Sequence, residues 1–136
     1  MFGRKHSKPQ SRIDSLIGAG TTIEGDLKFS GGMRIDGQVN GNVVAVQDKP
    51  STLVLSEHAR VTGEINVTHL VINGAINGPV FASEYLELQG KARVNGDVHY
   101  KTLEIQLGAI VEGRLIHSNV AVQDKVVAFK LNSGGE

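Results

Sequence analysis

The stretch Val94-Asn95-Gly96-Asp97-Val98 decides the fold, because its core recurs six times along the chain. That core is a Val or Ile two positions before a glycine. The six copies end at Gly25, Gly41, Gly63, Gly78, Gly96 and Gly113. The intervals between these glycines are 16, 22, 15, 18 and 17 residues. Self-similarity at a period of this size is typical of a solenoid, in which each repeat stacks on the one before it.

Further apolar columns appear when the copies are aligned on the glycine. Two positions after it lie Leu27, Val43, Ile65, Val80, Val98 and Leu115. From the second copy onward, a pair of apolar residues spaced by two precedes the motif, as Leu86 and Leu88 do. The residues between the columns are mostly polar. Alternation with a period of two predicts β-strands with one buried face and one wet face.

Two all-β folds can explain these strands. Asn-Gly dipeptides at 40–41, 73–74, 77–78 and 95–96 are hairpin signals and favour an antiparallel sandwich or barrel. Hairpins, however, give no reason for equal columns in every repeat, whereas stacked turns do. We therefore predict a parallel β-solenoid of about six rungs with three short faces per rung. The rungs are expected at 16–32, 33–52, 53–69, 70–85, 86–102 and 103–119, with residues 47–51 as a loop.

Composition sets limits on function. The 136 residues are 40% apolar but only 4% aromatic, which predicts a narrow aliphatic core. The absence of Cys excludes disulfides and thiolate metal sites, and a net charge of zero gives no case for nucleic-acid binding. No apolar run is long enough to span a membrane, and no secretory signal is evident, so we expect an intracellular protein. We expect a disordered basic tail at 1–12, a β-helix domain at 13–131 and a disordered tail at 132–136.

The pattern resembles the bactofilins, a family of bacterial cytoskeletal proteins, over residues of about 13–131. The resemblance rests on the segments 23–27, 35–41 and 94–98 and on an opening Met1-Phe2 followed by basic residues. It implies a right-handed, three-faced β-helix that forms non-polar filaments without nucleotide. It further implies attachment to the inner face of the membrane and a scaffolding role for cell-wall or cell-shape proteins. The implied partners are other copies of the chain, anionic lipids and those morphogenesis proteins.

A solenoid has two open ends, and these are the candidate polymerisation surfaces. No amphipathic helix precedes residue 13 or follows residue 119, and the segment 120–131 has the pattern of an apolar partial rung. The residues that we expect at end-to-end contacts are Ile13, Leu16, Val120, Val122, Val127, Phe129 and Leu131. The alternative is that 120–131 folds back and covers the end of its own rod.

The tail is the candidate membrane-targeting segment, through Met1, Phe2, Arg4, Lys5 and Lys8. Each basic residue near an anionic surface contributes about 1 kcal/mol, and Phe2 adds a small apolar contribution. The alternative is a plain solvated terminus. One such tail is too weak to hold a monomer, so membrane binding is expected to depend on the many tails of a filament.

An enzymatic alternative is a hexapeptide-repeat acyltransferase, which is another β-solenoid and uses a histidine as a base. Such enzymes keep a strict six-residue phase, which the intervals between the aligned glycines do not. The four histidines of the body, His58, His69, His99 and His117, lie at different offsets from the glycine, although His117 falls in an inward column. We therefore expect no catalytic, cofactor-binding or metal-binding residues.

Overall fold

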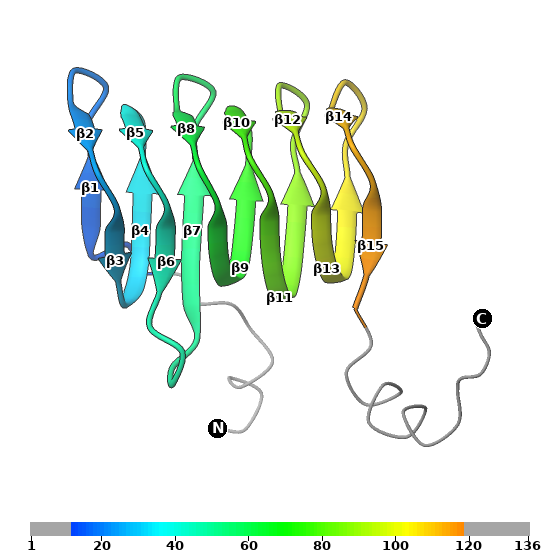
Figure 1. The fold of residues 1–136 in the computed structure, drawn as a ribbon, viewed down its shortest axis with the longest axis horizontal. Helices are drawn as coiled ribbons and strands as arrows, with labels where there is room; N and C mark the ends of the chain where they lie inside the picture. The colour runs from blue at the N-terminus through cyan, green and yellow to red at the C-terminus, as the bar shows by residue number, and fades with distance from the viewer. Residues whose placement is uncertain (1–11, 119–136) are drawn as a thin grey trace.

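The computed structural model describes residues 12–118, whereas residues 1–11 and 119–136 lie outside the described part. The expectations for the basic tail, for the segment 120–131 and for residues 132–136 therefore concern residues that the structure does not describe. Within 12–118 the chain consists of short β-strands joined by turns and coiled into a rod (Figure 1).

Each turn of the rod supplies one strand to each of three faces. Face 1 holds β1 (Ser15–Ile17), β4 (Gly31–Ile35), β7 (Ser51–Leu55) and the second halves of β9 (Ile65–Ile72), β11 (Val80–Leu88) and β13 (Val98–Ile105). Face 2 holds β2 (Thr22–Glu24), β5 (Gln38–Asn40), β8 (Arg60–Thr62), β10 (Ala75–Asn77), β12 (Arg93–Asn95) and β14 (Ile110–Glu112). Face 3 holds β3 (Leu27–Phe29), β6 (Val43–Ala45), the first halves of β9, β11 and β13, and β15 (Leu115–His117).

Face 2 is a six-stranded sheet with one strand per turn, so the rod has six rungs. All strand pairs in residues 12–118 are parallel, which confirms the solenoid and excludes the antiparallel sandwich. Parallel pairing results because each turn runs in the same direction as the one beneath it. The Asn-Gly dipeptides therefore lie at corners between faces and not in hairpins.

The structure confirms the columns that the glycine alignment predicts. Val61 pairs with Val39 on one side and with Ile76 on the other, and Val94 pairs with Ile76 and Val111. The core of this column is closed to solvent, since Val39 and Val61 are 0% exposed. Burying one such aliphatic side chain stabilises the fold by roughly 1.5–3 kcal/mol. The core is therefore a stack of aliphatic layers along the rod, as the composition predicts.

The aligned glycines form a ladder at the corner between faces 2 and 3. A Cβ atom on Gly63 would lie 2.2 Å from the carbonyl oxygen of Gly41, and one on Gly41 would lie 2.1 Å from that of Gly25. Gly63 also has a φ of +149°, a conformation that other residues rarely adopt. Close stacking of the rungs at this corner therefore requires glycine.

The corner between faces 1 and 2 explains why the repeat is irregular. It contains four residues in rungs 1, 3, 5 and 6, as at 56–59, but two residues in rungs 2 and 4, as at 36–37. The short corners fit beneath the long ones: the N–H groups of Asp36 and Gly37 both donate to the carbonyl of Ile17, at 2.8 and 3.2 Å. The predicted loop is confirmed between β6 and β7, where it protrudes from the edge of the rod (Figure 1).

Candidate polymerisation surfaces at the two ends of the rod

The N-terminal end of the rod is formed by β1, β2 and β3. Each of these strands has a partner on one side only within residues 12–118, so its outer edge carries unpaired backbone groups. The inward side chains of this rung, Ile17, Ile23 and Leu27, pack against the core but are only partly buried. A further rung at this end would cover both the strand edges and these apolar side chains.

Ile13 and Leu16, which we expected at end-to-end contacts, are both exposed here, by 41% and 61%. Leu16 is in register with Arg34 on the next rung, whereas Ser15 and Ile17 are in register with the inward Met33 and Ile35. Leu16 therefore lies on the outer surface of face 1, beside the open end and not within its apolar layer.

Asp14 fixes the start of the described chain against the second rung. Its Oδ2 accepts a hydrogen bond from the backbone N–H of Gly32 at 3.1 Å. Its Oδ1 accepts one from Nε of Arg12 at 2.9 Å. These bonds lower the pKa of Asp14, with the backbone N–H of Gly32 as the larger cause. The chain therefore enters the rod at the corner between faces 3 and 1.

The C-terminal end exposes more apolar surface. Ile105 is 48% exposed, although its counterpart on the previous rung, Leu88, is 0% exposed. Leu115 is 44% exposed, against 0% for Val98 with which it pairs. These differences are the exposure that one additional rung would remove. The inward columns thus remain apolar in the last described rung, except for the column that ends in His117.

Two further side chains of this rung are apolar and exposed. Leu107, at the corner between faces 1 and 2, is 99% exposed, and Ile110 on the outer surface of face 2 is 46% exposed. His117 is in register with Tyr100, and their rings lie 5.5 Å apart, but His117 is exposed. It therefore stands at the open edge of the last described rung.

Sequence reasoning missed several of these end residues. Ile23 and Leu27 at one end, and Ile105 and Leu115 at the other, lie in inward columns that the alignment had identified, whereas Ile17 lies in a column that it showed only from the second copy onward. The signal was available, because any inward residue of a first or last rung must be partly uncovered. The other predicted contact residues lie outside the described part: Val120, Val122, Val127, Phe129 and Leu131. The same is true of the membrane-targeting residues Met1, Phe2, Arg4, Lys5 and Lys8.

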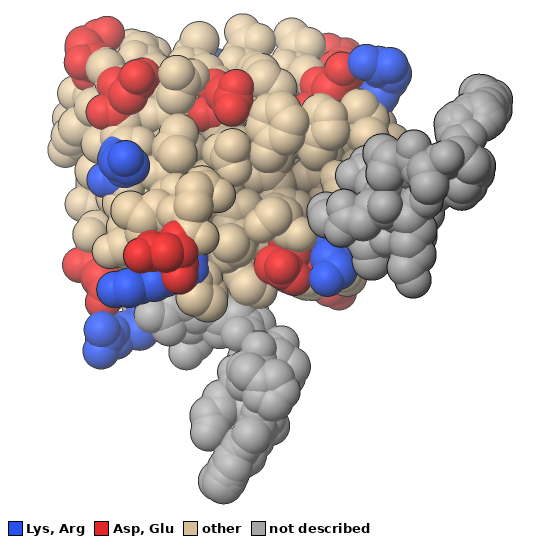
Figure 2. Space-filling model, turned by 60° about the horizontal axis from the view of Figure 1, so that its bottom comes forward, with Lys and Arg blue, Asp and Glu red and all other residues tan. Residues whose placement is uncertain are grey.

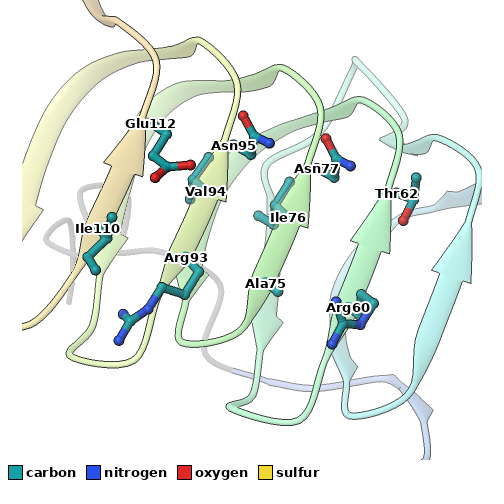
Figure 3. Close-up of a pocket in the computed structure, with 10 residues that line it drawn as sticks. All are labelled: Arg60, Thr62, Ala75, Ile76, Asn77, Arg93, Val94, Asn95, Ile110 and Glu112. Atoms are coloured by element: carbon teal, nitrogen blue, oxygen red, sulfur yellow. The ribbon is translucent and has the colours of Figure 1, made fainter.

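The side of the rod carries a shallow depression of about 310 Å³ on the outer surface of face 2 (Figure 3). It lies over the small side chain of Ala75, between Arg60 and Arg93 on the strands to either side. The guanidinium of Arg93 donates from Nη1 to the carbonyls of Ala92 and Gly108, at 2.8 and 3.0 Å. The depression is therefore a gap in a flat polar wall. Its lining contains no Cys, His or Ser, and its acid and hydroxyl groups are those of Glu112 and Thr62.

Comparison with known proteins agrees with this architecture. The family model of the bactofilins, described as polymer-forming cytoskeletal, matches residues 15–116, which are nearly all the residues of the rod. The chain belongs to the bactofilin family. Membership places it in a structural, cytoskeletal family whose members polymerise.

Two curated relatives of this bactofilin come from Myxococcus xanthus (strain DK1622). Bactofilin BacO is 26% identical over 102 residues, which are 75% of this chain and 78% of BacO. Bactofilin BacP is 25% identical over 116 residues, which are 85% of this chain but 47% of BacP. This chain therefore spans about half the length of BacP. No solved structure matches it significantly.

Residues 12–118 lack two other kinds of feature, a cluster of metal ligands and a membrane-spanning helix. No group of three or more His, Cys, Asp or Glu side chains that could hold a metal ion occurs in this part of the bactofilin. Nor does the same part contain a helix of the length and apolarity needed to cross a membrane.

Proposed function

We propose that this bactofilin assembles into filaments by end-to-end stacking of its β-helix, without nucleotide. The observation that supports the proposal is the uncovered apolar layer at each end of the described rod. Val98 is fully buried, whereas Leu115, one rung later in the same column, is 44% exposed. Stacking a second rod on this end would bury such side chains and pair the open strand edges.

The segment that follows the described rod is our proposed contact at the C-terminal end. Val120 and Val122 follow Leu103 and Ile105 by one repeat length, and on this sequence spacing we propose that they continue the same columns as a partial rung. Val127, Phe129 and Leu131 then supply apolar side chains to the junction. At the opposite end, Ile13 and Leu16 are proposed to contact the neighbouring rod.

We assign the basic tail to the inner face of the cytoplasmic membrane. Phe2 can insert at the surface of an anionic bilayer, while Arg4, Lys5 and Lys8 are attracted to its charge. The contributions of a single tail are small and screened by salt. A filament presents many tails at once, so attachment rises steeply with assembly. A filament attached in this way is a scaffold on which cell-wall or cell-shape proteins are organised, and the role requires no catalysis.

Electron microscopy of the purified chain in buffer without ATP or GTP tests assembly. We expect filaments, and light scattering that rises with protein concentration. A chain that stays monomeric at tens of micromolar, across ordinary salt concentrations, would contradict the proposal.

Removal of residues 1–8 tests the role of the tail. We expect the shortened chain to form filaments but not to sediment with anionic liposomes, while the full chain does both. High salt should release the full chain. Equal sedimentation of both chains would assign membrane binding to another surface.

A further inference from the structure

A band of outward side chains runs along face 3 for the length of the rod. None of these side chains is acidic. The outward residues of the six strands of face 3 are in register from one rung to the next. From the N-terminal to the C-terminal end they are Lys28, Val44, Asn66, Phe81, His99 and Ile116. Figure 2 looks onto this face and shows uncharged residues between two rows of charged side chains. Lys28 supplies the one formal charge of the band, at its N-terminal end, when histidine is neutral.

The middle of the band is ordered by aromatic stacking. The rings of Phe81 and His99 lie face to face, with centroids 4.4 Å apart and an interplanar angle of 14°. The Nδ1 atom of His99 is buried and has no hydrogen-bond partner in the described structure. Phe81 is only half-buried although it lies in the middle of a parallel sheet, on β11. A line of uncharged side chains that includes a half-buried aromatic ring is therefore a candidate contact surface.

The two edges of the band differ in charge. The corner between faces 2 and 3 carries Asp26, Glu64 and Asp97, of which Asp97 is paired with Arg114 at 2.9 Å. The corner between faces 3 and 1 carries acids and bases together, as in the pair of Lys101 and Glu84 at 3.6 Å. One edge is thus net acidic and the other is balanced.

We propose that face 3 is the lateral contact between two copies of this chain in neighbouring filaments. The inference rests on the proposed function, because it requires filaments. Two such bands placed face to face bury apolar and aromatic side chains and leave the charged rows at a solvated rim, which is the usual anatomy of an interface. An anionic membrane fits the face less well, because Asp26 and Glu64 would lie against lipid charges of the same sign.

Charge also selects the orientation of the two rods. In antiparallel rods related by a two-fold axis, the acidic edges face each other. In parallel rods related by a two-fold axis along the filament, the acidic edge of each rod faces the balanced edge of the other. Like charges set opposite one another disfavour association. The parallel arrangement sets each rung, and so each Lys28, opposite the same rung of its partner. It is still favoured, because antiparallel rods would set the whole acidic edge, with Asp26, Glu64 and Asp97, against its own copy.

The size of the face restricts the contact to filaments. Six strands at about 4.8 Å and three residues of about 3.3 Å give an area of about 290 Å². A stable interface needs about 800 Å² per partner. Two single rods therefore do not pair through face 3, whereas two filaments repeat the contact at every subunit and associate by avidity.

The test compares Phe81→Glu with Asn77→Glu, which adds the same charge to face 2 of the same rung. We expect electron micrographs to show paired or bundled filaments for the native chain and for Asn77→Glu, and single filaments of similar length for Phe81→Glu. The β circular dichroism signal should be equal in all three chains. Because Phe81→Ser removes the ring without adding charge, it should also give single filaments.

The outcomes separate this inference from the proposed function. Absence of filaments from the native chain would overturn end-to-end assembly and this inference with it. Single native filaments, or bundles that persist in both Phe81 variants, would overturn only the lateral contact. Loss of binding to anionic liposomes in Phe81→Glu with unchanged bundling would assign face 3 to the membrane and likewise overturn it.

Cross-linking tests the orientation, because the chain contains no native cysteine. Single variants Val44→Cys and His99→Cys place a thiol on rungs 2 and 5, away from the end-to-end junctions. In parallel rods each variant should form dimers with itself when a short thiol-reactive cross-linker is added. Cross-links between Val44→Cys and His99→Cys in mixed filaments, without self-dimers of either, would contradict the parallel arrangement.

Discussion

Replacement of Gly63 by alanine should destabilise the rod by about 3 kcal/mol, from two separable causes. The first cause is the φ of +149° at Gly63, which costs a residue with a Cβ about 1–3 kcal/mol. The second is contact, because the new Cβ would lie 2.2 Å from the carbonyl oxygen of Gly41. Relief of that contact separates two rungs by about 1 Å. Separation weakens the bonds between these rungs, from Gly41 N to the Thr62 carbonyl and from Val43 N to the Glu64 carbonyl, at 2.9 and 2.8 Å.

The chain offers variants that isolate each cause. Gly25→Ala has the strain without the contact, because φ is +130° but no atom lies within 4 Å of the new Cβ. Gly41→Ala has the contact, at 2.1 Å from the Gly25 carbonyl, without a strained φ. Gly20→Ala has neither, since nothing lies within 4 Å. We expect losses of about 1–2 kcal/mol for Gly25→Ala and about 2–3 kcal/mol for Gly41→Ala, and a change within about 0.5 kcal/mol for Gly20→Ala.

Urea unfolding followed by β circular dichroism measures these differences, at concentrations where light scattering shows no assembly. The reasoning is refuted if Gly63→Ala and Gly20→Ala unfold at the same urea concentration. Equal losses for Gly25→Ala and Gly63→Ala would show that strain alone acts and that rungs do not approach as closely as described. Gly25 also lies at the open end, so filament loss in Gly25→Ala without a large stability loss would indicate a neighbouring rod stacked on it.

Three other predictions follow from the same rod. Leu70→Ala removes a side chain that is 0% exposed and should cost about 2–5 kcal/mol in urea unfolding, whereas Leu115→Ala, at 44% exposure on the end, should cost less than about 1 kcal/mol but weaken assembly. Phe129→Arg, in the proposed partial rung, should abolish filaments while the β circular dichroism signal persists; loss of that signal would instead make Phe129 part of the core of its own rod. Asp14 and Asp97 have pKa values lowered below 3.8, by the N–H of Gly32 and by the side chain of Arg114, respectively. Their contribution to stability is therefore complete above the ordinary pKa and is lost as the pH falls through the lowered value, so the free energy of unfolding measured from about pH 5 to pH 2 should decrease; removal of both carboxylates (Asp14→Asn, Asp97→Asn) should make that decrease smaller.

The sequence was sufficient to predict the solenoid because stacking places equal residues in equal environments. From the second motif onward, the glycine that ends each motif lies where only glycine allows the rungs to approach, and the Val or Ile before it is always inward. Irregular intervals did not obscure the pattern, and the structure explains them. The 22-residue interval includes both the loop at 46–50 and a four-residue corner, whereas the 15-residue interval has a two-residue corner.

Other features could not be predicted from the repeat. The first rung lacks the Leu or Ile pair of the other rungs, so Leu16 gave no sign that it points outward while Ser15 and Ile17 take the inward positions. The band on face 3 was missed for a different reason. Val44, Phe81 and Ile116 are apolar residues in an outward column that also holds Lys28 and Asn66, and only the strand register shows that they lie in one line.

If the rod assembles end to end as proposed, its folding and its assembly depend on the same interactions between rungs. Rung 5 is held on rung 4 by the burial of inward aliphatic side chains and by parallel backbone hydrogen bonds, and the last described rung presents the same groups. A repeat of this kind has no intrinsic end unless a polar capping rung provides one. A substitution in an inward column therefore changes stability when it lies in the middle and assembly when it lies at an end, as the pair Leu70 and Leu115 should show. A substitution in an outward column, such as Phe81, should leave the core and the ends of the rod intact and act mainly on what lies beside the rod.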